Sequence, residues 1–341
     1  MKNFVFQNPT KLVFGKGQIA RLAKLIPADA RVMITFGGGS VKRNGVYEQV
    51  KSALSSIEHC EFWGIEPNPS VETLRKAVAQ GREFGANFLL AVGGGIVTDV
   101  AGFAASTFMR GVEFGFISTS LLGQVDASVG GKNGVNVDGY KNMVGTFTQP
   151  RFVICDVNLL RTLSAREFRT GLAEIIKAGV IGDATLFEML EQADFSTLQR
   201  DTERLSEIVY RTVKVKADIV ERDERESGDR RLLNLGHTLA HAIEKSSSKF
   251  NHGEAVAVGL AMIADVAAKQ CLLAVEDKER ILNLLQRAGF ALEPPVEVRT
   301  LLKAVKRDKK AEGNDIYIVF PRAIGRCEVV RMPVEEFKAL V

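Results

Sequence analysis

Hydrophobic positions in the first half of the chain come in short continuous runs, separated by segments with helical spacing. The runs are typical of buried parallel strands and occur at residues 31–36, 60–63, 88–92 and 114–117. Apolar residues at intervals of three and four predict amphipathic helices at 41–54, 71–84 and 97–107. This alternation predicts a doubly wound parallel sheet, that is, a Rossmann-like α/β domain.

The stretch from 118 to 150 interrupts this alternation. Glycines punctuate it, and it ends at Pro150. We therefore expect a long loop, which in a compact chain is usually functional or disordered. Its polar residues are mixed with Val and Met, which favours function, and the candidates are Asp126, Lys132, Lys141 and Asn142.

From Val157 to about Leu292 the spacing is almost entirely helical, and no proline occurs between Pro150 and Pro294. The short runs at 316–320 and 327–330, around Gly325, predict a small hairpin. We expect an α/β domain over 1–155 and a mostly α-helical domain over 156–341, with ligands in the cleft between them.

Composition excludes several classes of protein. With 46% apolar and 25% charged residues in 341, the chain has ample core material and is not disordered. Its first residues lack the apolar core of a signal peptide, and no apolar run is long enough to span a membrane. The four cysteines are scattered without a CxxC pair, and the +4 charge is spread along the chain. We expect a cytoplasmic protein with neither nucleic-acid nor membrane partners.

Three of the four histidines lie close together in the sequence. His237 and His241 share one face of a helix predicted over 233–245, and His252 begins the next apolar helix. A catalytic zinc takes three protein ligands and leaves one position open. Glu174 is the best carboxylate candidate, because an unpaired acid in an apolar helix is costly. The alternatives are surface or capping histidines and a solvated Glu174–Lys177 pair.

Two glycine triplets follow predicted strands. Gly93–Gly95 precedes a helix, where backbone N–H groups can face a pyrophosphate, although a plain tight turn is the alternative. Gly37–Gly39 is followed by Ser40, Lys42 and Arg43 rather than by the acid that binds the adenosine ribose in Rossmann-like units. We therefore expect tolerance of a 2′-phosphate.

Several basic residues have glycine or apolar neighbours in the sequence. Singly, each is more typical of a solvated cation, but beside a metal they indicate a polyanionic substrate such as a phosphorylated sugar acid. They are Arg110, Lys132, Lys141, Lys177, Lys216, Arg230, Lys309 and Lys310.

Long motifs from residue 93 to roughly 330 resemble 3-dehydroquinate synthase. They are GGGIVTDVAGFAASTFMRG (93–111), STSLLGQVDASVGGKNGVN (118–136), KNMVGTFTQP (141–150), GLAEIIKAGVI (171–181), KADIVERDERESGDRRLLNLGHTLAHAIE (216–244), HGEAVAVG (252–259) and KRDKK (306–310). The first 92 residues instead resemble iron-type, NADPH-using alcohol and butanol dehydrogenases, through PTKLVFGKGQIARL, ITFGGGSVKRNGVYEQV, GIEPNPSVETLRKA and FLLAVGGG. We interpret the chain as a hybrid, engineered or natural, joined at the common glycine turn.

The resemblance implies a dehydroquinate synthase-like fold and a redox-neutral phosphate elimination. In that family NAD oxidises the C5 hydroxyl of 3-deoxy-D-arabino-heptulosonate 7-phosphate, phosphate leaves, the hydride returns, and the ring opens and recloses by an aldol reaction to 3-dehydroquinate. The cofactors implied are NAD and one divalent ion, zinc or cobalt. The absent ribose-binding acid leads us to expect that NADP is also accepted.

Carried over position by position, the resemblance assigns the site residues. Glu174, His237 and His252 would bind the metal, and His241 would relay the C5 proton. Substrate and anion contacts would come from Asp126, Lys132, Asn142, Lys177, Lys216, Arg230, Asn234 and Lys309. Arg110 would reach the site of a neighbouring subunit, which implies a homodimer. Nucleotide contacts would come from Glu66, Gly94, Gly95, Ile96, Asp99, Thr119, Ser120, Lys132 and Lys141. Pro69 replaces the lysine of the family's Gly-Glu-x-x-Lys motif.

Three other functions remain open at this point. An iron-type NAD(P) alcohol dehydrogenase would follow from the N-terminal third, and a related sugar-phosphate cyclase would use the same residues on another substrate. A hybrid that folds without turnover is the third.

Overall fold

The computed structural model describes residues 9–137, 140–305 and 314–341, and for 140–142 it describes the backbone alone. The chain divides into two compact units, Met1–Ser164 and Ala165–Val341. The boundary predicted at 155/156 precedes a 3-10 segment, η4 (Val157–Thr162), that the structure includes in the first unit.

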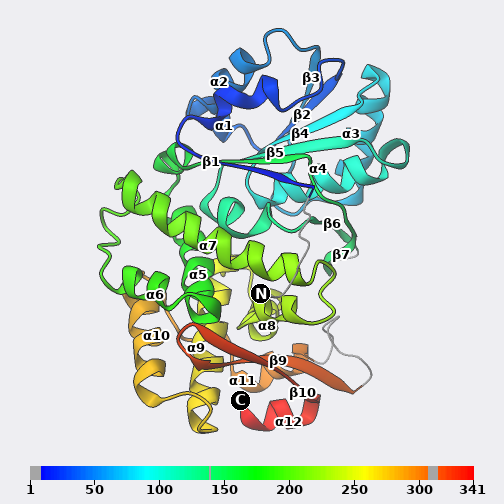
Figure 1. The fold of residues 1–341 in the computed structure, drawn as a ribbon. Helices are drawn as coiled ribbons and strands as arrows, with labels where there is room; N and C mark the ends of the chain where they lie inside the picture. The colour runs from blue at the N-terminus through cyan, green and yellow to red at the C-terminus, as the bar shows by residue number, and fades with distance from the viewer. Residues whose placement is uncertain (1–8, 138–139, 306–313) are drawn as a thin grey trace, which may run out of the picture. The chain divides into compact units, whose positions relative to one another are not determined.

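The first unit is built on a six-stranded, wholly parallel sheet in the order β1-β8-β5-β4-β2-β3 (Figure 1). The strands are β1 (Lys11–Gly15), β2 (Val32–Phe36), β3 (His59–Phe62), β4 (Phe88–Gly93), β5 (Glu113–Ser118) and β8 (Phe152–Asp156). Every residue of β2, β4 and β8 is buried, as expected for strands covered on both faces. The α/β architecture is confirmed, and β1 and β8 are strands that the sequence did not single out.

Helices cover both faces of this sheet. On one face Leu22, Val50 and Leu54 join the core cluster, and on the other Ala77 and Val100 do so. The helices are η1 (Gln18–Lys24), α1 (Ser40–Arg43), α2 (Val46–Ala53), α3 (Val71–Phe84), α4 (Gly95–Thr107) and η2 (Phe108–Arg110). The single helix predicted over 41–54 is wrong, because Gly45, at φ 77°, separates α1 from α2.

The long loop expected over 118–150 is wrong as well. It contains a π-helical turn, η3 (Gly123–Ala127), and a hairpin of β6 (Lys132–Val137) and β7 (Tyr140–Phe147) that packs on α4. Gly134 and Gly145 are paired across the hairpin, and a Cβ on Gly145 would lie 2.3 Å from the Asn133 carbonyl oxygen. These glycines permit close strand pairing, whereas in the sequence they suggested loop.

The second unit is mostly helical, as predicted. Its helices are α5 (Ala165–Gly182), α6 (Ala184–Glu191), α7 (Thr202–Arg222), η5 (Asp229–Asn234), α8 (His237–Ser246), α9 (His252–Lys269), α10 (Val275–Arg287), α11 (Val298–Val305) and α12 (Val334–Leu340). The predicted hairpin is confirmed as β9 (Asp315–Ala323) and β10 (Arg326–Pro333), with Gly325 in its turn. The helix predicted over 233–245 instead starts at His237, because Gly236 takes a left-handed φ of 74°.

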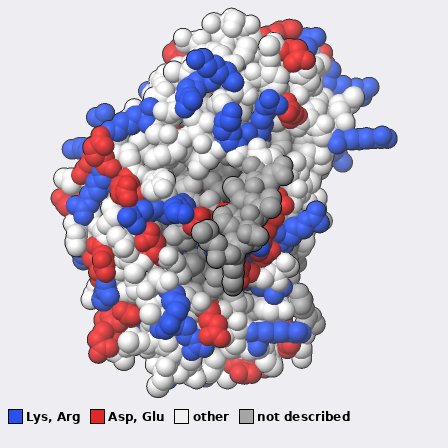
Figure 2. Space-filling model, viewed as in Figure 1, with Lys and Arg blue, Asp and Glu red and all other residues white. Residues whose placement is uncertain are grey.

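Among the residues that the structure describes, no helix has both the length and the apolar character needed to cross a membrane. On the face drawn in Figure 2, basic and acidic side chains are interspersed, in keeping with the small net charge of +4.

Candidate metal centre and nucleotide-binding turn

Three side chains of the second unit converge as the sequence predicted. Glu174 stands in the middle of α5, whereas His237 and His252 are the first residues of α8 and α9. One ligand atom from each lies within 4.8 Å of the other two. The Glu174 Oε1 atom is 3.2 Å from His252 Nε2 and 3.4 Å from His237 Nε2. The Glu174 side chain is only 2% exposed, so this is an enclosed carboxylate.

Glycines let the three helices approach closely enough to bring these ligands together. A Cβ on Gly253 would lie 2.3 Å from the carbonyl oxygen of Thr170 in α5. A Cβ on Gly259 of α9 would lie 2.3 Å from the carbonyl oxygen of Gly236, which precedes α8. Any side chain at these two positions would push the ligand-bearing helices apart.

Both histidines are oriented by groups behind them. The Nδ1 atom of His237 lies 3.2 Å from the Leu235 carbonyl oxygen, which can only accept, so Nδ1 carries the proton. The Nδ1 atom of His252 lies 3.6 Å from the buried Glu244 carboxylate. Each Nε2 is therefore directed at Glu174. Two imidazoles and one carboxylate with such outer partners are the donor set of a catalytic zinc site, so the residues fit a divalent ion.

The charges of this cluster are strongly coupled. Burial acts to raise the pKa of Glu174, but Lys177 and His252 outweigh it and lower the pKa to about 2. Burial acts to lower the pKa of His252, but Glu174 and Glu244 outweigh it and raise the pKa to about 10. A metal held here must therefore displace a proton from His252, so its binding releases protons.

Lys177 forms an ion pair with Glu174 and donates a hydrogen bond to the Leu233 carbonyl oxygen at 2.8 Å. The sequence left open a Glu–Lys pair on a solvated face. The pair exists, but the Lys177 side chain is only 4% exposed, so the pair belongs to the buried cluster. A cation beside the metal ligands suits an anionic or hydroxyl-bearing substrate.

His241 lies one turn beyond His237 on α8. The two rings meet edge to face with centroids 5.7 Å apart. His241 is outside the group of three ligands. Its role as a proton relay remains a prediction.

The segment between α7 and α8 holds two more predicted residues, Arg230 and Asn234. Arg230 is 2% exposed and donates from its guanidinium to the Glu224 carbonyl oxygen. Asn234 donates to Glu226, which has a left-handed φ of 64°. Sequence reasoning missed Glu226, because it lies in a run of acidic and basic residues where no single glutamate can be distinguished by its neighbours.

Asp223 organises this segment and was also missed. Its carboxylate accepts hydrogen bonds from the backbone N–H groups of Ser227, Gly228 and Arg230, at 3.0, 2.6 and 3.0 Å. Burial acts to raise the pKa of Asp223, but these hydrogen bonds lower it to about 2. Lys216, another predicted residue, is buried on α7.

In the first unit, the Gly93–Gly95 turn joins β4 to α4. A Cβ on Gly94 would lie 3.0 Å from Ser120 Oγ, and one on Gly95 would lie 2.7 Å from the Ala127 Cβ. The N-cap of α4 is Gly94, which has no side chain to cap the helix. The Val97 N–H donates to the Gly94 carbonyl oxygen, and the N–H groups of Gly95 and Ile96 before it can face an anion. This turn fits the pyrophosphate of a dinucleotide.

Several other predicted nucleotide contacts surround this turn. The Thr119 N–H donates to the Gly93 carbonyl oxygen at 2.9 Å, and Ser120 Oγ accepts from the Gly123 N–H at 3.1 Å. Asp126 is in η3 beside Ala127, Asp99 is in the first turns of α4, and Ile96 is 42% exposed. The structure thus brings the glycine turn, Thr119, Ser120 and η3 together.

Three other predicted residues have the following surroundings, and four more are not fully described. Arg110 is exposed and has a left-handed φ of 67°, and Lys132 Nζ lies 5.9 Å from the centroid of the Phe147 ring. The Glu66 carboxylate accepts hydrogen bonds from Ser70 and Thr73 at the start of α3, so it stabilises that helix. The side chains of Lys141 and Asn142, and all of Lys309 and Lys310, lie outside the described residues.

The short helix α1, which follows β2, carries Lys42 and Arg43, the cations expected near a 2′-phosphate. Lys42 Nζ lies 4.1 Å above the Trp63 ring, which itself stacks on Phe36. This cation–π contact holds the ammonium group near the carboxyl ends of β2 and β3. Directly after β2 the chain has Gly37–Gly39 in place of the ribose-binding acid.

Comparison with known proteins identifies the family. The 3-dehydroquinate synthase N-terminal profile matches residues 68–170, and the 3-dehydroquinate synthase C-terminal profile matches residues 171–311. The chain belongs to the 3-dehydroquinate synthase family. Members of this family are carbon–oxygen lyases. The match begins at residue 68, ahead of the junction inferred at residue 93.

Individual relatives agree with this identification. The 3-dehydroquinate synthase of Acaryochloris marina is 44% identical over 247 residues, which is 71% of this chain and 66% of that protein. The chain therefore matches about two thirds of that relative's length. Among solved structures, 2-epi-5-epi-valiolone synthase from Streptomyces hygroscopicus, with NAD+ and Zn2+ bound, is 26% identical with a TM-score of 0.87, covering 100% of this chain and 98% of that one.

Iron-type dehydrogenases share the fold as well. The NADH-dependent butanol dehydrogenase A of Thermotoga maritima has a TM-score of 0.72 at 20% identity, covering 100% of this chain and 98% of that one. At that identity the likeness concerns the fold alone. The sequence resembles dehydroquinate synthases in one part and iron-type dehydrogenases in another, and solved structures of both kinds of enzyme share this fold.

Proposed function

We propose that this chain is a working 3-dehydroquinate synthase. It converts 3-deoxy-D-arabino-heptulosonate 7-phosphate to 3-dehydroquinate and phosphate, using bound NAD and one divalent ion. The observation that carries the proposal is the enclosed cluster of Glu174, His237 and His252 with the cation of Lys177 beside it. Family membership gives this cluster its chemistry.

The metal, when bound to these three residues, would polarise the substrate's adjacent oxygens, and NAD would accept and return one hydride. Lys177 would pair with an anionic group or hydroxyl of the substrate. His241 would take and return the C5 proton, because it shares a helix face with His237 and its ring lies 5.7 Å from the His237 ring. Proton relay by a positioned histidine typically contributes 10²–10⁴-fold in rate.

The remaining residues would hold the substrate and the nucleotide. In the second unit Lys216, Arg230 and Asn234 would bind carboxylate, phosphate and hydroxyl groups, joined by Lys309. In the first unit Asp126, Lys132 and Asn142 would contact substrate. The Gly94–Gly95 turn with Ile96, Asp99, Thr119, Ser120 and Lys141 would hold the nucleotide. Glu66 would contribute through the start of α3.

We further infer a cytoplasmic homodimer in which Arg110 reaches the partner's site. The left-handed Met109–Arg110 pair supports this, because such strained positions cluster at functional sites. Met109, 73% exposed, presents an apolar side chain at the same place. We also expect NADP to be accepted, as the cations after β2 suggest.

The alternative that a specific observation favours is an iron-type alcohol dehydrogenase, because those enzymes share the fold. In such an enzyme the hydride would leave on the cofactor. The buried Lys177 and Arg230 favour the synthase, since buried cations suit an anionic substrate better than a simple alcohol.

The test incubates the protein with the heptulosonate phosphate, NAD and Zn2+ or Co2+, and follows phosphate and 3-dehydroquinate together. The synthase predicts equal amounts of both products, with loss of both in the presence of a chelator. A parallel reaction with a simple alcohol and NADP tests the dehydrogenase. Steady accumulation of NADPH there, with no phosphate released in the first reaction, would reject the proposal.

A further inference from the structure

The first turn of α9 lies across α5 in a regular register. Residues at four-residue intervals on α5 meet consecutive residues of α9, and the pairs are Arg166 with Glu254, Thr170 with Gly253, and Glu174 with His252. The third pair belongs to the candidate metal centre. The first two pairs therefore set the position of one ligand relative to another.

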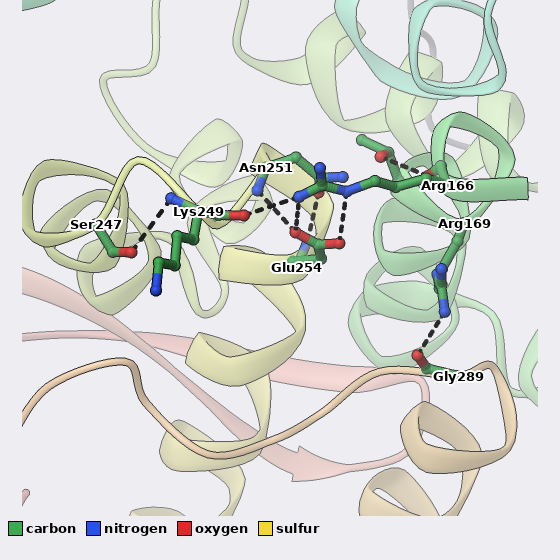
Figure 3. Close-up of polar contacts among 8 residues, drawn as sticks. Arg166, Arg169, Ser247, Lys249, Asn251, Glu254 and Gly289 are labelled. Carbon is green, nitrogen blue, oxygen red and sulfur yellow. Dashed lines mark hydrogen bonds and ion pairs between the residues drawn. The ribbon is translucent and has the colours of Figure 1, made fainter. Parts of the chain in front are cut away.

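Arg166 makes a two-point contact with Glu254 (Figure 3). Its Nε donates to Oε1 at 3.0 Å and its Nη2 donates to Oε2 at 2.8 Å. The same Nη2 donates to the Lys249 carbonyl oxygen at 2.8 Å, in the segment that leads into α9. One guanidinium at the start of α5 thus binds both the approach to α9 and its first turn.

The Glu254 carboxylate also caps the first turn of α9. Its Oε2 accepts the Asn251 N–H at 2.9 Å, while the Glu254 N–H donates to Asn251 Oδ1 at 2.9 Å. This capping box encloses His252, which stands between Asn251 and Glu254. The cap fixes the backbone of His252, and Arg166 fixes the cap to α5.

We propose that Arg166 and Glu254 are positioning residues for the metal centre. They hold His252 Nε2 close enough to Glu174 for both side chains to bind one ion. The inference rests on the proposed metal site. It assigns a role to two residues that touch neither metal nor substrate. Their effect passes through the helix start rather than through the reacting groups.

Exposure separates this role from simple structural support. The Arg166 side chain is 54% exposed, and exposed ion pairs contribute little to global stability. A positioning role therefore predicts a loss of metal affinity without a comparable loss of folding stability. A merely structural role predicts that both change together or that neither does.

The experiment compares Arg166→Ala with Arg169→Ala. Arg169 is the control on the same turn of α5, because it donates to the Gly289 carbonyl oxygen at 2.9 Å (Figure 3). Its charge also lowers the pKa of Glu254, so the two alanine variants separate the two-point contact of Arg166 from the loss of a nearby charge. Zn2+ affinity is measured by competition with a chromophoric chelator, and metal-free stability by urea unfolding. The visible spectrum of the Co2+ form reports the ligand geometry. Arg166→Lys, which keeps the charge but not the fork, serves as the conservative variant.

We expect Arg166→Ala to bind Zn2+ about tenfold more weakly and to shift the Co2+ spectrum, with Arg166→Lys intermediate. Arg169→Ala should match the wild type in Zn2+ affinity and in the Co2+ spectrum. Equal Zn2+ affinity and equal spectra for the two alanine variants would overturn the inference, as would a loss of affinity matched by an equal loss in Arg169→Ala. If the wild type itself did not bind Zn2+, the proposed metal site would be rejected, and the positioning role would be rejected with it.

Discussion

Replacing Gly253 with alanine tests the close approach of α9 to α5. The new Cβ would lie 2.3 Å from the Thr170 carbonyl oxygen and 2.6 Å from its Cα. Both are backbone atoms, so no side-chain rotation relieves the overlap. To reach a separation of 3.0 Å the two helices must move apart by at least about 0.7 Å.

The magnitude follows from two opposed effects. Overpacking of a buried site costs about 1–3 kcal/mol, whereas removing a helical glycine stabilises by up to about 1 kcal/mol. We expect Gly253→Ala to destabilise the metal-free protein by about 1–2 kcal/mol. The effect on the metal is larger, because ligand distances tolerate only about 0.2 Å and His252 moves with Gly253. We expect Zn2+ affinity to fall about 10- to 100-fold.

Gly182→Ala is the matched control, since Gly182 ends α5 and its added Cβ would meet only Val215 Cγ1 at an ordinary 3.5 Å. Urea unfolding of the metal-free proteins and competitive Zn2+ titration give both quantities. Gly182→Ala should keep wild-type affinity and be at least as stable as the wild type. If Gly253→Ala behaved in the same way, the close packing of the two helices would not be what sets the ligand spacing.

Three further predictions test the site and its surroundings. His241→Asn should keep Zn2+ and lose turnover by about 10²–10⁴-fold, and a stoichiometric loss of metal would make His241 a ligand instead. The pKa of Asp223 is lowered from 3.8 to about 2. The ionised carboxylate therefore adds about 2 kcal/mol to the free energy of unfolding above pH 4, and this stabilisation is lost as the pH falls from 4 toward 2. Urea unfolding should therefore show Asp223→Asn less stable at pH 7 and closer to the wild type at pH 3, and an equal deficit at both would contradict this. In titrations of metal-loaded protein, NADP should bind, and NAD should bind about 10- to 150-fold more weakly than in synthases that keep the ribose-binding acid. Failure of NADP to bind at millimolar concentration would refute that expectation.

The elements predicted best are those whose apolar residues follow a regular pattern along the whole element. β4 and α3 have their predicted positions, because a fully buried strand and a helix with one apolar face leave unmistakable periodicities. The hairpin of β6 and β7 was missed because its glycines permit strand pairing that the sequence alone does not show. The helix split at Gly45 was missed for a related reason, since a positive φ is a property of the folded backbone.

The candidate metal cluster was predictable, because three histidines in one short stretch and one acid in an apolar helix are rare patterns. The choice of His237 and His252 over His241 came from the resemblance to the family. The groups that orient these side chains were not predictable. The Leu235 carbonyl has no side-chain signature, and Glu244 and Arg166 resemble ordinary surface residues in the sequence. Only the capping box of Asn251 and Glu254 had a readable spacing, and its link to Arg166 depends on a partner 88 residues away.

The central claim is that the hydride removed from the substrate returns to it. The most direct test supplies the wild-type protein with Zn2+, excess heptulosonate phosphate and far less NAD than substrate, and measures 3-dehydroquinate together with reduced nicotinamide. The proposed mechanism predicts many molecules of product per molecule of NAD, with no net accumulation of NADH. Product that never exceeds the NAD supplied, with NADH rising in step, would contradict it.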